Sequence, residues 1–212
     1  MATDLIQVDI DQPYRGAIER AAEVIARGHI VGVPTDALYT LVADPFNLAA
    51  AGRVFAAKGR ETVHSLPLAV SDTLMAEDLA KDLSSRFFLL TRRFWPGPLT
   101  IIVPAAAKVP LKVTGNTGRL AMRHARSKVL NAIIDKIGHA LIATSANLSG
   151  EPTIPSGIDL FAALDGRVDL VLDGGPATGL GATTVDITEP YWKMIKHGAI
   201  EEKEIAACLQ PS

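Results

Sequence analysis

Short apolar runs typical of β-strands alternate with amphipathic helical segments along almost the whole chain. Pro13 opens a helical pattern over 14–27 that Gly28 ends, and the apolar run HIVGVP then predicts a short buried strand. The alternation continues without a Pro-rich linker, a charge block or a fixed-period repeat. We therefore predict one α/β domain over residues 1–212, built on a twisted, open, mixed sheet with flanking helices.

The remaining elements follow from caps and apolar runs. Asn47, Ser84 or Ser85, and Ser127 are placed to cap helices, and shorter helices are expected near 158–164 and close to the C-terminus. The run LTIIVP is continuously apolar, which predicts a strand covered on both faces of the sheet. Further strands are predicted at LYTLVAD, LPLAV, RLAMR, ALIAT, VDLVL, TTVDI and WKMIK.

Charge, cysteine and hydropathy patterns limit the possible functions. The formal net charge of -2 gives no strongly basic surface for bulk nucleic-acid binding, and Cys208 is the one cysteine, so no disulfide or cysteine metal cluster forms within the chain. The histidines lack metal-ligand spacing, and we predict no structural metal. Because the N-terminus does not resemble a signal peptide and no apolar run is long enough to span a membrane, we expect a cytoplasmic protein without membrane contact.

Polar residues collect where the predicted strands end. Ligands of open α/β sheets bind at such ends, so converging side chains would form a cleft with several cations and hydroxyl groups, suited to a polyphosphate. Taken singly, each cluster is equally well explained as a turn or a helix cap. The clusters are Thr35-Asp36, Lys58-Gly59-Arg60, Arg123, Ser145-Ala146-Asn147 and Lys196-His197-Gly198.

Other common chemistries lack their signatures. The chain has neither a Gly-x-x-x-x-Gly-Lys-Ser/Thr phosphate loop nor a Gly-x-Gly-x-x-Gly turn after its first strand. It also lacks a Gly-x-Ser-x-Gly nucleophile elbow, and aromatic residues make up only 5% of it, too few for a base-stacking surface.

Several longer stretches occur together in a characteristic order: VPTDALYTL, VFAAKGR with LPLAV, FWPGPLTIIV, LAMR, ATSANLSGEP, VDLVLDGGPATGLGATTVDIT and KHGAI. In this the chain resembles the YrdC-like family of L-threonylcarbamoyl-AMP synthases, over about residues 15–200 and in the short, single-domain form. The resemblance implies a concave, positively charged surface. It also implies that L-threonine, bicarbonate and ATP are converted to threonylcarbamoyl-AMP and pyrophosphate, for threonylcarbamoyladenosine modification of tRNA.

The resemblance also assigns residues. Lys58 and Arg60 would bind the nucleotide phosphates and support catalysis, with Ser145 and Asn147 beside them. Thr153 and Lys196 would add nucleotide contacts, and Thr35 and Arg123 would bind the threonine substrate. ATP is then a substrate that carries Mg²⁺ with it, without dedicated protein ligands. Expected partners are tRNA threonylcarbamoyl-transfer proteins downstream, with tRNA or double-stranded RNA as a candidate ligand.

The chain departs from the family pattern near the expected site. Glu61 replaces a usual proline, Thr40 a usual glycine and His124 a usual apolar residue. Ala182-Thr183-Thr184 replaces Ser-Thr-Val, so that Thr183 or Thr184 would have to supply the missing hydroxyl, and Lys196-His197-Gly198 replaces Arg-Pro-Gly. Two alternatives therefore stay open: a YciO-like paralogue that binds RNA or nucleotide without adenylating threonine, and an enzyme that adenylates another amino acid or amine.

Overall fold

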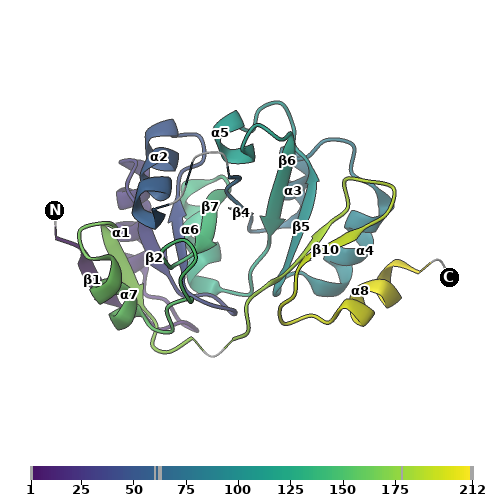
Figure 1. The fold of residues 1–212 in the computed structure, drawn as a ribbon. Coiled ribbons are helices and arrows are strands. Elements are labelled where there is room, and N and C mark those ends of the chain that lie inside the picture. The colour runs from purple at the N-terminus through teal and green to yellow at the C-terminus, as the bar shows by residue number, and fades with distance from the viewer. Residues whose placement is uncertain (1, 60, 62–63, 178, 211–212) are drawn as a thin grey trace.

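The strands of the chain form one mixed sheet. The structure, a computed structural model, describes residues 2–59, 61, 64–177 and 179–210. Within this part the sheet has the order β1-β8-β2-β3-β7-β4-β6-β5-β9-β10 (Figure 1). Its strands are β1 (Asp4–Gln7), β2 (Val31–Val33), β3 (Thr40–Ala43), β4 (Leu68–Ala69), β5 (Leu99–Pro104), β6 (Arg119–Arg123), β7 (Leu141–Ser145), β8 (Leu170–Asp173), β9 (Thr183–Asp186) and β10 (Lys193–Lys196).

The helices begin and end near the predicted residues. Asn47 accepts hydrogen bonds from the amides of Ala49 and Ala50, and Ser127 accepts one from Leu130, so both side chains cap as expected. Ser84 stands at its predicted cap position, but its side chain makes no capping hydrogen bond. The helices are α1 (Arg15–Ala26), α2 (Leu48–Lys58), α3 (Thr73–Leu79), α4 (Ser85–Phe94), α5 (Leu111–Thr114), α6 (Lys128–Ile137), α7 (Gly157–Leu164) and α8 (Glu202–Leu209).

The two faces of the sheet are covered unequally. On one face, side chains of α1 and α6 form an apolar core with strands from β8 through β4, and Ile25, Ile133 and Val31 all belong to it. The opposite face carries a larger core to which α2, α3, α4, α5, α7 and α8 all contribute. Because α1 and α6 cover only part of their face, β6, β5 and β9 present a row of half-buried residues beyond them.

Strand β5 shows this difference directly. Its residues alternate between buried and half-buried: Leu99, Ile101 and Val103 enter the larger core, whereas Thr100 and Ile102 lie on the other face and line a cavity. The prediction that this strand is covered on both faces was therefore wrong. A continuous apolar run conceals which of its residues face the core, since isoleucine suits either environment.

Three elements escaped the sequence reading. The short strand β1 exists through parallel pairing with β8, and most of its residues are exposed. Asp72 caps α3 by accepting a hydrogen bond from Met75, and α5 is a single turn. None of the helices in the described part combines the length and hydropathy needed to cross a bilayer.

Candidate active site

A cavity of about 440 Å³ lies on the face of the sheet that α1 and α6 leave partly uncovered. Four of the predicted ligand-binding residues line it, namely Thr35, Arg123, Ser145 and Lys196, and so do Thr40, Ala182 and Thr184. The four predicted ligand-binding residues come from the turn after β2, from β6, from β7 and from β10. None of the lining residues in the described part of the chain is acidic. The cavity therefore favours an anionic ligand.

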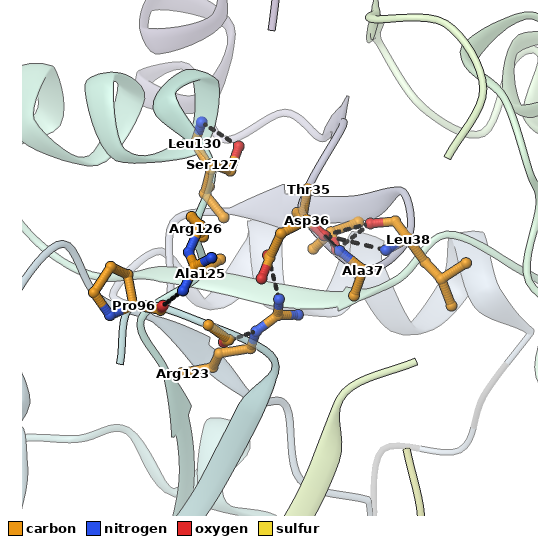
Figure 2. A network of polar contacts seen from close by, with 12 residues as sticks. Thr35, Asp36, Ala37, Leu38, Pro96, Arg123, Ala125, Arg126, Ser127 and Leu130 are labelled. Carbon is orange, nitrogen blue, oxygen red and sulfur yellow. Dashed lines mark hydrogen bonds and ion pairs between the residues drawn. The ribbon is translucent and has the colours of Figure 1, made fainter. Parts of the chain in front are cut away.

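Arg123 is held in place at the cavity wall. Its guanidinium pairs with the carboxylate of Asp36, and its Nε donates to the carbonyl of Gly97 at 2.9 Å. Figure 2 shows Arg123 and Asp36 pointing toward each other beside the Thr35 turn. Only 14% of the Arg123 side chain and 15% of Asp36 are exposed. Burial lowers the pKa of Arg123, and the Asp36 charge opposes that shift. The pair thus presents a fixed cation.

Thr35 organises the turn that follows β2. Its Oγ1 donates to the carbonyl of Leu38 at 2.6 Å and accepts from the amides of Ala37 and Leu38, both at 3.2 Å (Figure 2). Thr35 therefore acts as a turn residue and also lines the cavity. The interpretation of Thr35 as a turn residue is therefore compatible with its interpretation as a binding residue.

Lys58 ends α2 and is 3% exposed. Its ammonium donates to the carbonyl of Ser145 at 2.6 Å, and to the carbonyl and the Oδ1 of Asn147, both at 2.9 Å. The Ser145 hydroxyl also donates to Asn147 Oδ1, at 2.7 Å. The sequence motif of Lys58 and that of Ser145 and Asn147 are thus brought together. In this arrangement Lys58 fixes the segment after β7.

The other predicted residues are not among the described residues that line the cavity. Arg60 lies outside the described residues. Thr153 is half-buried in the loop before α7 and is not among the described residues that line the cavity. Glu61 and His197 are exposed and likewise absent from that lining. Among the described positions, the structure therefore unites Thr35, Arg123, Ser145 and Lys196 around one space, with Lys58 and Asn147 behind Ser145.

Sequence reasoning missed several residues of the cavity. Thr100 and Ile102 line it, as does Tyr39. Burial raises the pKa of Tyr39 to about 12, so this phenol remains protonated and donates to the carbonyl of Gly175 at 2.7 Å. Thr100 directly follows Leu99, which is buried. Adjacent residues of a strand point to opposite faces, so the position of Thr100 next to a core leucine was the available signal that it faces away from that core.

The structure also distinguishes Thr183 from Thr184. Thr183 is fully buried, and its hydroxyl donates to the carbonyl of Ile200 at 2.8 Å and accepts from the amide of that residue. Thr184 points to the opposite face of β9 and lines the cavity together with Ala182. Only Thr184 is therefore placed to supply the hydroxyl that Ala182 lacks.

His124 gives a pH-dependent expectation. Burial lowers its pKa below the ordinary 6.5, and the carboxylates of Asp72, Asp135 and Asp36 offset this shift only in part. The unfolded chain then binds a proton that the folded chain does not, so folding stability decreases as pH falls below about 6.5. We expect His124→Gln to lose less free energy of unfolding than wild type between pH 7 and pH 5, as measured by urea denaturation. Equal losses would contradict the assignment.

Metal-ligand geometry does not appear in this region. Over the residues that the structure describes, no three or more His, Cys, Asp or Glu side chains are grouped closely enough to hold a metal ion. The cations and hydroxyls of the cavity instead suit phosphate and carboxylate oxygens directly.

Comparison with known proteins places this geometry in a family. A sequence model of the Sua5/YciO/YrdC family, described as telomere recombination, matches residues 23–198. Threonylcarbamoyl-AMP synthase of Pyrococcus abyssi is 32% identical over 189 residues, covering 89% of this chain and 56% of that protein. The chain thus spans little more than half of this relative. Threonylcarbamoyl-AMP synthase of Xanthomonas campestris strain B100 is 34% identical, covering 76% of this chain and 88% of that protein.

A solved structure extends the likeness to three dimensions. The crystal structure of Pyrococcus abyssi Sua5 complexed with L-threonine superposes with a TM-score of 0.93 at 30% identity. The superposition covers 98% of this chain and 61% of that one. The predicted α/β fold, with its open mixed sheet and flanking helices, is confirmed by this match.

Proposed function

Since the chain belongs to the Sua5/YciO/YrdC family, we propose that it is an ATP-dependent, adenylate-forming transferase that makes threonylcarbamoyl-AMP. One observation carries this proposal above the others: Thr35, Arg123, Ser145 and Lys196 line one cavity whose described lining contains no acidic residue. A carboxylate and a phosphate chain are the groups that such a space accommodates. Relatives bearing the synthase name support the choice of reaction.

The proposed reaction joins three substrates. The amine nitrogen of L-threonine bonds to the carbon of bicarbonate, whose hydroxyl leaves as water with a proton from the amine, and a carbamate results. A carbamate oxygen then attacks the α-phosphorus of ATP. The new bond is carbamate oxygen to phosphorus, and the bond between that phosphorus and the bridging oxygen to the β-phosphate breaks. The electron pair leaves with pyrophosphate. Because no difficult proton transfer is required, positioning and charge neutralisation should provide most of the rate.

Each residue has a part in this scheme. Arg123, held by Asp36, would bind the threonine carboxylate, and Thr35 would border the same amino acid. Lys58 would place Ser145 and Asn147 against the nucleotide phosphates, and Lys196 would neutralise phosphate charge from the opposite wall. Arg60 and Thr153 complete the proposed nucleotide contacts. Mg²⁺ would enter bound to ATP, with phosphate oxygens as its ligands.

The cellular location and the partners of the protein belong to the same proposal. We place the protein in the cytoplasm, upstream of proteins that transfer the threonylcarbamoyl group to tRNA, with residues 1–212 forming one domain. The cavity also makes tRNA or double-stranded RNA a ligand worth testing. Such binding would weaken steeply with salt, because it would depend on phosphate contacts.

The test is threonine-dependent pyrophosphate release. Purified protein with ATP, Mg²⁺ and labelled bicarbonate should release pyrophosphate and form a labelled adenylate only when L-threonine is added. An amino-acid panel in the same assay tests for a different substrate. RNA or ATP binding without pyrophosphate release, even after the downstream transfer proteins are added, would overturn the proposal in favour of a YciO-like binding protein.

A further inference from the structure

Four side chains of the cavity stand in one row across four adjacent strands. The β5·β9 register pairs Thr100 with Thr184, and the β9·β10 register pairs Thr184 with Lys196. On the other side, β5 and β6 pair Ile101 with Met122 in antiparallel register, so the next step places Arg123 opposite Thr100. All four residues line the cavity. We call Arg123, Thr100, Thr184 and Lys196 the cross-strand row.

The middle and one end of the cross-strand row have unused hydrogen-bonding capacity. The hydroxyls of Thr100 and Thr184 and the ammonium of Lys196 have no hydrogen-bond or ion-pair partner within the described part of the chain. This contrasts with the neighbouring Thr183, whose hydroxyl is satisfied twice. Arg123 uses Nε and one Nη2 hydrogen, so its Nη1 group remains available for a ligand.

The order of groups in the row matches an extended ligand with two different anionic ends. Adjacent strands are about 4.8 Å apart, so the row spans about 14 Å between the Cα atoms of Arg123 and Lys196. A planar guanidinium binds a carboxylate well, whereas a lysine ammonium neutralises phosphate as a point charge. The two hydroxyls lie between these charges and are donors for ligand oxygens.

We infer that Thr184 is a phosphate-binding residue at the end of the cross-strand row that carries Lys196. The Thr184 hydroxyl donates to the same phosphate that Lys196 neutralises, since the two residues are register partners. This inference rests on the proposed function and deepens it. It assigns a specific ligand group to the Thr184 hydroxyl, which the sequence left open between Thr183 and Thr184.

Titrations of ATP and of L-threonine into two Thr184 variants test the inference. Thr184→Val keeps the side-chain shape without the hydroxyl, and Thr184→Ser keeps the hydroxyl as the matched control. Loss of a hydrogen bond to a charged group predicts about a tenfold weaker affinity for ATP in Thr184→Val. Its threonine affinity and its thermal unfolding midpoint should not change, and Thr184→Ser should bind ATP nearly as wild type does.

The outcomes distinguish failure of the phosphate role of Thr184 from failure of the proposed function. Unchanged ATP affinity in Thr184→Val, or equal losses for ATP and threonine, would overturn the phosphate role of Thr184. Failure of the proposed function has a different signature, because wild type would then release no threonine-dependent pyrophosphate. In that case a selective loss of ATP affinity in Thr184→Val would still support the inference. A wild-type chain that does not bind ATP would overturn both.

Discussion

Lys58→Met is expected to weaken ATP binding by about 100-fold and to lower the free energy of unfolding by about 2–3 kcal/mol. The lysine is buried, and its ammonium supplies hydrogen bonds to the carbonyls of Ser145 and Asn147 and to the Asn147 side chain. The amide of Ser149 also donates to the Lys58 carbonyl at 2.8 Å, so α2 and the segment after β7 are joined twice. Without the ammonium, three partly buried acceptor oxygens lose a donor, and the segment after β7 that we propose to bind phosphate loses its position.

Isothermal titration with ATP and urea denaturation would measure the two effects. Lys112→Met is a matched control, since the Lys112 ammonium also donates to a backbone carbonyl, that of Leu48, but at the exposed start of α2. We expect this control to bind ATP as wild type does and to lose less than about 1 kcal/mol. If Lys58→Met bound ATP with unchanged affinity, Lys58 would have no role in the nucleotide site.

Arg123→Met is expected to abolish threonine-dependent pyrophosphate release, with a loss of at least about 100-fold, and to destabilise the fold by about 3 kcal/mol. The guanidinium is the cation fixed most firmly at the cavity wall, and its removal also leaves the nearly buried Asp36 without its counter-charge. The catalytic loss and the stability loss thus have separate causes.

A double variant separates these causes. In Arg123→Met with Asp36→Asn, no uncompensated carboxylate remains, so part of the stability should return while threonine binding stays lost. Arg20→Met serves as the surface control, because the Arg20–Asp4 pair is 40% and 56% exposed and contributes at most about 1 kcal/mol. Threonine binding that recovered in the double variant would mean that Arg123 acts only through the fold.

Much of the site was accessible from residue patterns, because the polar clusters interrupt apolar runs. Thr35, Arg123, Ser145 and Lys196 were singled out in this way, and the structure gathers all four at the cavity. The role of Lys58 was less accessible. A lysine in the last helical turn usually serves the helix dipole, and only the tertiary structure shows its ammonium directed at the segment after β7.

The role of Thr100 and the choice between Thr183 and Thr184 lay beyond sequence reasoning for a different reason. Thr183 and Thr184 are chemically identical, and one residue of strand phase decides which enters the core and which lines the cavity. That phase is set by pairing with β5 and β10, which are distant in the chain. The same dependence explains why β1 and the half-covered face of β5 were missed.

The amino-acid sequence alone determined the element order, most helix ends and the choice of a mixed α/β sheet, because hydrophobic periodicity and capping side chains act over a few residues. The tertiary structure decided which face of the sheet stays uncovered and which hydroxyls meet the cations there. These features depend on strand registers and on where α1 and α6 stop covering the sheet, and such long-range pairings leave no local pattern in the chain.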